Sequence, residues 1–185
     1  MEKNRYLAGV FSPIIALGGV GAAIILNRSW WRITENAISD LGKVGLPHNW
    51  VMNSAFVIAS ALGIYYALGS LRELKNFVQK LGVGIFGAGL LFLALIGIFP
   101  EGTSPHYYVS WAFFITASLG MLITGIGFYV EEDRKFGAFT VILFLIAWFL
   151  SMEAMRTFKG VAVPEFIGAF GIATWHYTLL ARLKG

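Results

Sequence analysis

Six apolar runs, each about as long as a bilayer is thick, limit how this chain can fold. They cover residues 6–27, 51–71, 81–99, 107–129, 136–152 and 163–181. A helix needs roughly 20 such residues to cross the hydrocarbon core, where backbone polar groups must be paired within the protein. The sequence therefore predicts an all-α integral membrane protein built as a six-transmembrane-helix bundle. Residues 1–185 are expected to form a single membrane domain, because little chain remains outside the runs.

Composition supports a lipid environment and excludes several other classes of protein. The chain is 57% hydrophobic and 13% charged, whereas a soluble domain is about half apolar and a quarter charged. Cysteine is absent, which excludes disulfides and thiolate metal ligands. The net charge of +4 comes from lysines and arginines scattered at the ends of the apolar runs, without a basic patch. We therefore expect no nucleic-acid partner.

The distribution of basic residues between the connections predicts an orientation, because cytoplasmic loops carry an excess of lysine and arginine. One side holds Lys3, Arg5, Arg72, Lys75, Lys80, Arg134, Lys135, Arg182 and Lys184, and the other holds Arg28, Arg32, Lys43, Arg156 and Lys159. This bias places both termini in the cytoplasm of a multi-pass protein of the plasma membrane. The connections after the first, third and fifth runs then face outward.

The first outer connection, residues 28–50, contains the densest run of polar side chains. Trp30 and Trp31 stand beside arginines, as is typical of residues at the lipid headgroups. Apolar residues recur at helical spacing over residues 30–42, which predicts a short interfacial helix ended by Gly42. Such a helix either lies over the bundle as a lid or is an ordinary surface helix facing water and headgroups.

Polar side chains of this connection fall into pairs one helical turn apart. Asn36 aligns with Asp40, and Glu35 with Ser39. The later outer connections add Glu101 and His106, each next to a proline. An ionisable residue at the depth of His106 is a candidate for function, and Ser110 follows it by one turn. The alternative interpretation is a histidine that forms only interfacial hydrogen bonds.

Three further outer-side features are candidates for binding. His48 follows a proline, and Asn53 begins the second run one turn after Asn49. Glu153 and Arg156 are three residues apart at the end of the fifth run, so they can pair on one helical face. Arginine can instead clamp a phosphate or carboxylate with two parallel hydrogen bonds.

These motifs together resemble a small prokaryotic six-span membrane-protein family of unknown function, which is in turn similar to the Frag–DRAM–Sfk group. The resemblance rests on Ile38-Ser39-Asp40-Leu41-Gly42, on Phe99-Pro100-Glu101-Gly102-Thr103 with His106, and on Glu153 with Arg156. It covers nearly the whole chain in the layout of its spans. Some members of the distant group remodel or organise lipids, including lipid anchors. The resemblance marks Ser39, Asp40, Gly42, Pro100, Glu101, His106 and Arg156.

The leading hypothesis is an outer-side polar pocket that binds, and in an enzymatic version remodels or hydrolyses, a lipid or an anionic headgroup. Asp40 and Glu101 would supply carboxylates, His106 an acid or base, and Ser39 a nucleophile if a base lies within reach. Candidate headgroup-binding residues are Arg156, Glu35, Asn36, His48, Asn53, Trp30 and Trp31. We expect Asp40, Glu101, His106 and Arg156 to converge. Membrane lipids are the expected partners, and the oligomeric state stays open.

Three alternatives remain at this point. A divalent metal bound by Asp40, His48, Glu101, His106 and Glu153 would give a hydrolytic site, although no HExxH spacing supports it. A small-solute transporter or channel would need polar residues near the bilayer midplane, where this sequence has mainly Ser, Thr and Gly. A structural or partner-binding membrane protein would use the outer face only for docking. The cofactor, if any, is left open.

Overall fold

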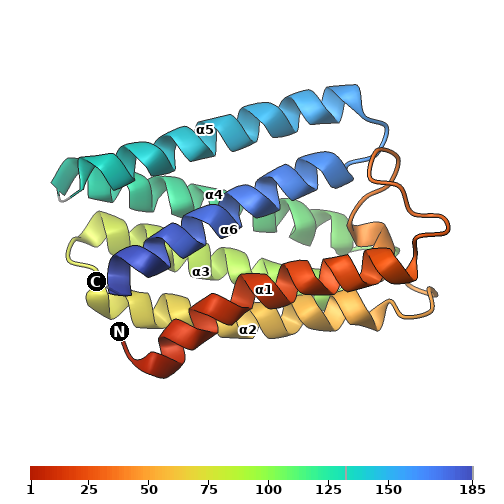
Figure 1. Ribbon diagram of the computed structural model, residues 1–185, viewed down its shortest axis with the longest axis horizontal. Helices are drawn as coiled ribbons and strands as arrows, with labels where there is room; N and C mark the ends of the chain where they lie inside the picture. The colour runs from red at the N-terminus through yellow and green to blue at the C-terminus, as the bar shows by residue number, and fades with distance from the viewer. Residues whose placement is uncertain (132, 185) are drawn as a thin grey trace.

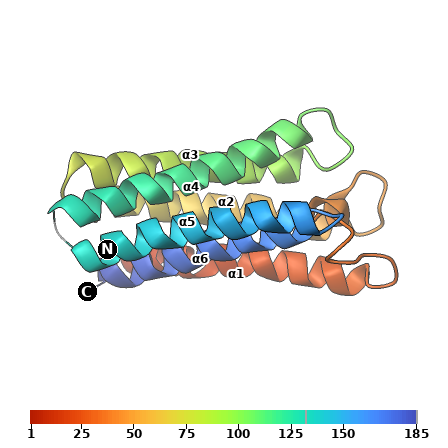
Figure 2. The same ribbon diagram turned by 90° about the horizontal axis from the view of Figure 1, so that it is seen from above.

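The six predicted runs form six helices packed side by side. The computed structural model describes residues 1–131 and 133–184. Within them lie α1 (Lys3–Leu26), α2 (Trp50–Glu73), α3 (Phe77–Ile98), α4 (His106–Glu131), α5 (Arg134–Thr157) and α6 (Ala162–Lys184). Both termini lie at one end of the bundle, the terminal end; the opposite end is the distal end (Figure 1). Each helix packs on the next, and α6 returns to α1 and closes the bundle (Figure 2).

Five of the helices, α1 to α5, are long and apolar enough to cross a membrane. The chain is therefore a membrane-embedded helical protein. The sixth, α6, is 23 residues long but less apolar, because Glu165 and the run Trp175-His176-Tyr177 lie within it. His176 Nε2 donates to the Gly9 carbonyl of α1 at 2.8 Å, and the Tyr177 hydroxyl donates to Val10 O at 2.9 Å. The polar residues of α6 thus attach it to α1.

Close contact between α3 and α4 depends on glycines. A Cβ on Gly89 would stand 2.7 Å from the Ala117 backbone nitrogen, nearer than real Cβ atoms approach such an atom. A Cβ on Gly84, in the same helix, would meet nothing within 4 Å. Small residues let helix backbones approach in lipid, where apolar burial does not drive association. Gly89 therefore sets the α3–α4 spacing and Gly84 does not.

Substituting Gly89 with alanine is expected to destabilise the bundle by about 1–3 kcal/mol, the usual cost of overpacking a close contact. Thermal unfolding in a mild detergent measures this loss. Gly84→Ala is the matched control, and its stability should stay equal to that of the wild type or rise slightly. Equal stability of the two variants would show that the helices do not meet at Gly89.

The expectation of a helix over residues 30–42 is wrong. This stretch consists of turns, followed by the 3-10 helix η1 (Ser39–Gly42). One cause is local: the Asn36 side-chain oxygen accepts from Arg32 N at 2.8 Å, and the Asp40 carboxylate accepts from Ala37 N at 2.9 Å. Short polar side chains that bind nearby backbone amides in this way compete with helix formation.

The second cause is tertiary, and it involves the connection between α5 and α6. Gly160 N donates to the Thr34 carbonyl at 3.1 Å, and Ala162 N donates to the Asn36 carbonyl at 2.9 Å. These carbonyls would accept intrahelical bonds if residues 30–42 were helical. Gly160 is required here, because a Cβ on it would overlap the backbone of Asn36. Long-range backbone hydrogen bonds therefore prevent the helix that the spacing of the apolar residues predicts.

Two further expectations for this connection need correction. Trp31 is not exposed for contact with headgroups: it is buried, donates to the Ala37 carbonyl at 2.9 Å, and packs in a small core with Ile38 and Leu41. Gly42 does not cap a helix but lies inside η1, where its carbonyl accepts from the Asn53 side chain at 2.9 Å. The buried residues Trp31, Ile38 and Leu41 thus face the bundle, so this part of the connection lies over the helix ends.

Candidate functional site

The first connection joins the other two at the distal end. Val44 N donates to the Glu101 carbonyl in the α3–α4 connection at 2.9 Å. On its other side, the carbonyl of Asn36 accepts from Ala162 N, at the start of α6. Three segments far apart in the sequence are thereby held as one polar cluster over the bundle. Asp40, Glu101 and His106, three of the titratable residues that the sequence singles out, lie in these segments together with Glu165.

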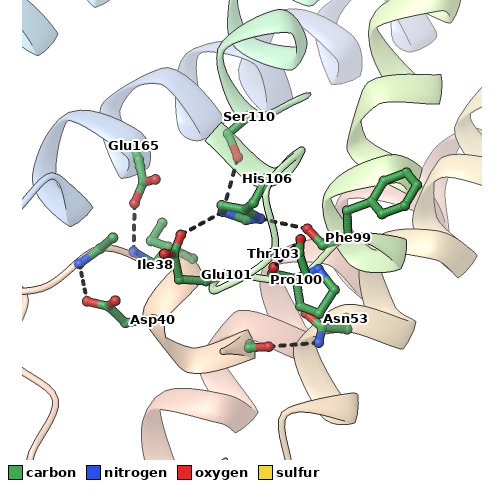
Figure 3. Close-up of polar contacts among 12 residues, drawn as sticks. Ile38, Asp40, Asn53, Phe99, Pro100, Glu101, Thr103, His106, Ser110 and Glu165 are labelled. Atoms are coloured by element: carbon green, nitrogen blue, oxygen red, sulfur yellow. Dashed lines mark hydrogen bonds and ion pairs between the residues drawn. The ribbon is translucent and has the colours of Figure 1, made fainter. Parts of the chain in front are cut away.

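His106 lies at the centre of the cluster and has three polar partners (Figure 3). It begins α4 and is buried. Its Nδ1 lies 2.8 Å from the Phe99 carbonyl oxygen, which can only accept, so Nδ1 carries a proton. Its Nε2 lies 3.2 Å from the Ser110 hydroxyl and 3.2 Å from a carboxylate oxygen of Glu101. The ring is thus fixed in one orientation, with Nε2 facing a hydroxyl and a carboxylate.

Glu165 joins the cluster from the first turn of α6. Its carboxylate accepts from Ile38 N at 2.6 Å, a bond that spans 127 residues of sequence. In Figure 3 its side chain points toward Ile38, and that of Glu101 points toward His106. The carboxylates of Asp40 and Glu101 both lie close enough to interact electrostatically with that of Glu165. Three acidic groups therefore share this region of the distal end.

Asp40 and Asn53, expected to serve catalysis and binding, hold the first connection in place. The Asp40 carboxylate accepts from Ala37 N at 2.9 Å and from the Asn36 amide at 3.2 Å. Asn53 is buried in α2 and donates to the Gly42 carbonyl. Asn36 itself lies in the same hydrogen-bonded turn. One oxygen of the Asp40 carboxylate and the Asn53 amide nitrogen are thus occupied by the fold of the connection, whereas the buried Asn53 side-chain oxygen has no hydrogen-bond partner among the described residues.

Several other predicted residues lie away from His106. Arg156 is 70% exposed and pairs with Glu153 at 2.8 Å, so the expected convergence does not include it. Glu35 and His48 are exposed, and His48 occupies a turn with φ of 67°. Trp30 is partly exposed and donates to Asn27. Of the four residues expected to converge, Glu101 and His106 are in contact and Asp40 lies near Glu165.

The residues proposed as metal ligands are dispersed. Within residues 1–131 and 133–184, no group of three or more His, Asp or Glu side chains is arranged to hold a metal ion. Glu101 and His106 are in contact, but Glu153 is engaged by Arg156 and His48 lies on an exposed turn. The five-residue metal hypothesis therefore gains no support from the geometry.

Two cavities lie within the bundle below the polar cluster, and Ser110, Phe114, Glu165 and Ile172 line both of them. One, of about 100 Å³, lies in the centre of the bundle, and the other, of about 140 Å³, lies between α4, α5 and α6. Each is far larger than the ~10–15 Å³ that admits one water molecule. Ser39 lines the central cavity. The candidate site is therefore a polar cluster placed over apolar space.

Ser110 and Glu165 were not among the predicted site residues. The one-turn spacing of His106 and Ser110 was a visible signal, because residues four apart on a helix are neighbours. Glu165 also had a weak signal, the acid that follows Pro164 at the start of an apolar run. Its contact with Ile38 had none, because the two residues are separated by four helices.

The fold and the site together define a multi-pass helical membrane protein with a hydrogen-bonded polar cluster above two internal cavities. The chain belongs to the family described as "Protein of unknown function (DUF998)", which matches it over residues 10–182. This confirms the expectation of an uncharacterised family, while similarity to the Frag–DRAM–Sfk group stays a prediction. No curated protein and no solved structure matches the chain.

Proposed function

We propose that the protein binds a membrane lipid at its distal end, with an acyl chain in the apolar cavities and the polar part of the lipid at the His106 cluster. The observation that carries this proposal is that both cavities reach Ser110 and Glu165, directly beneath the cluster. Ligand sites are concave, mostly apolar and equipped with a few convergent polar groups. The distal end has these features.

The lining of the central cavity suits a hydrocarbon chain. Its walls come from α1, α2, α3, α4 and α6, and they are mainly aliphatic and aromatic, with residues such as Leu90, Leu93 and Phe113. Polar groups stand at two levels: Ser39, Ser110 and Glu165 in one group, and Ser12 with His176 in the other. Most of the surface between them offers no hydrogen bond, which favours a chain over a polar solute.

The second cavity gives the site a side that faces the surrounding bilayer. It lies against α5, the helix least covered by its neighbours. Of the apolar 18-residue stretch of α5, 11% is buried inside the protein, whereas 50% of the corresponding stretch of α4 is buried. Large apolar side chains such as Leu145 and Phe149 are exposed on α5. A lipid chain approaching between α5 and α6 reaches Ser110 and Glu165 without passing through the polar connections.

The charges of the cluster favour a neutral or cationic polar group rather than an anionic headgroup. The carboxylates of Glu101 and Asp40 place negative charge there, and they repel an anion in this partly dry environment. Arg156, the expected clamp for an anion, pairs with Glu153 instead.

We place the distal end on the outer side of the plasma membrane and count α6 as a sixth span, which the bias of Lys and Arg supports.

Filling the central cavity should block lipid binding. Ala169 lines this cavity one turn after Glu165, so Ala169→Phe places a ring in the space for the chain. The purified protein is incubated with equal amounts of dioleoyl-phosphatidylethanolamine and dioleoyl-phosphatidylglycerol and analysed by native mass spectrometry. We expect the wild type to retain the ethanolamine lipid preferentially. Ala169→Phe should weaken retention about fivefold or more, because the ring takes the space of the chain and overpacking costs at least ~1 kcal/mol.

The matched control is Ala61→Phe, which adds the same ring at an exposed position on α2. This variant should retain lipid as the wild type does. Equal retention by Ala169→Phe and Ala61→Phe would contradict a chain in the central cavity. A preference for the glycerol lipid would contradict the proposal of a neutral or cationic polar group and would favour an anionic ligand.

A further inference from the structure

We propose that Ser110 is a nucleophile that cleaves an ester of the bound lipid, with His106 as its general base. This inference rests on the proposed lipid site and adds a reaction to it. The central observation is the 3.2 Å contact between the Ser110 hydroxyl oxygen and His106 Nε2. A serine hydroxyl becomes a useful nucleophile when a base within hydrogen-bond reach accepts its proton.

The orientation of His106 makes Nε2 the basic atom. Because Nδ1 donates to the Phe99 carbonyl at 2.8 Å, the neutral ring carries its lone pair on Nε2. That lone pair faces Ser110, one helical turn further along α4. The Phe99 carbonyl thus acts as the group that fixes the tautomer. Ser110, His106 and the Phe99 carbonyl are therefore joined by two successive hydrogen bonds, as a nucleophile, a base and an orienting group would be.

Glu101 is placed to stabilise the protonated base. Its carboxylate oxygen lies 3.2 Å from Nε2, the atom that would receive the Ser110 proton. Once Nε2 is protonated, it can donate to Glu101 in a charge-assisted hydrogen bond. Burial of His106 strengthens this interaction, since the effective dielectric constant is lower than in water. Glu101 is a positioning residue in this scheme.

Ser110 is also the hydroxyl best placed to meet a lipid ester. It lines both cavities, so a chain held in either one lies beside this residue. Ser39, the nucleophile expected from the sequence, lines the central cavity alone. Within the described residues, no hydrogen bond joins Ser39 to a base. The geometry thus favours Ser110 over Ser39.

The reaction balances with water as the second substrate. Ser110 Oγ attacks the carbonyl carbon of the ester while its proton passes to His106 Nε2. The ester C–O bond breaks, the departing alcohol takes the proton from Nε2, and an acyl-serine remains. Water then attacks the acyl-serine, His106 accepts its proton and returns it to Ser110, and the fatty acid leaves. A neutral carbonyl suits this acidic site better than a phosphodiester, which is an anion.

A long-chain alkyl fluorophosphonate, which phosphonylates activated serines, tests this assignment on the full-length protein in mild detergent. We expect one adduct by intact mass, mapped to Ser110 by peptide analysis. Ser110→Ala should lose the adduct. His106→Gln should slow labelling about 100-fold, the lower end of the usual contribution of a general base. Ser54→Ala, which alters an exposed serine of α2, should be labelled at the wild-type rate.

The outcomes separate this inference from the proposed lipid site. Lipid retention by native mass spectrometry without any phosphonylation would overturn the role of Ser110 and leave the lipid site standing. An adduct on Ser39, or on several serines equally, would also overturn it. If the wild-type protein neither retained lipid nor was phosphonylated, both proposals would be contradicted. Because the mapped site on the wild type decides the question, a poorly folded His106→Gln protein does not prevent a decision.

Discussion

Replacing His106 with alanine is expected to destabilise the protein by about 2–4 kcal/mol, because the change both opens a cavity and removes buried hydrogen bonds. The imidazole is buried and contacts Phe99, Glu101 and Ser110. Its loss leaves the Phe99 carbonyl without this partner and frees the α3–α4 connection. Thermal unfolding in mild detergent measures the effect.

The control for this substitution is His48→Asn. His48 is exposed and has a positive φ, which asparagine tolerates. Exposed substitutions of this kind usually change stability by no more than about 0.5 kcal/mol. If both variants unfolded at the wild-type temperature, the His106 hydrogen bonds would not hold the distal end together.

Removing the carboxylate of Glu165 is expected to release the first connection from α6. Glu165→Ala leaves the buried Ile38 amide without its acceptor, and an unsatisfied buried donor costs about 1–3 kcal/mol. Hydrogen exchange of the Ile38 amide should therefore accelerate about tenfold or more. Reduced repulsion with Asp40 and Glu101 offsets part of the loss.

Glu165→Gln distinguishes the hydrogen bond from the charge. Glutamine keeps an acceptor oxygen at nearly the same position, so protection of the Ile38 amide should stay close to that of the wild type. Glu35→Gln, a change at an exposed residue of the same connection, should have no effect on this amide. Fast exchange in Glu165→Gln, or slow exchange in Glu165→Ala, would contradict the assigned contact.

The helices were predictable because hydropathy is a local property of the chain. Each apolar run became one helix whose ends moved by a few residues, and five of these helices are long and apolar enough to cross a membrane. The pairing of Glu153 with Arg156 was one of two interpretations of their three-residue spacing, and the structure has that pair at 2.8 Å. Features that depend on residues close together in the sequence could thus be predicted from the sequence.

The distal connections show where local patterns fail. Residues 30–42 have a helical period, but the backbone carbonyls of Thr34 and Asn36 accept bonds from the α5–α6 connection instead. Apolar residues at helical spacing mark a buried face, and Ile38 and Leu41 are indeed buried. The pattern identified only part of the buried side, since Trp30 and Ile33 are exposed. It failed for secondary structure because residues about 125 positions away supply the backbone hydrogen-bond partners.

For the site, the sequence determined which chemical groups are available and at which end of the helices they lie. It placed Glu101, His106 and the polar first connection together at the distal end, since alternate connections of an up-and-down bundle share one end. Only the tertiary structure decided that Arg156 turns away and that Glu165 reaches Ile38. Side-chain contacts between separate helices depend on helix rotation and spacing, which packing at positions such as Gly89 and Ala117 sets.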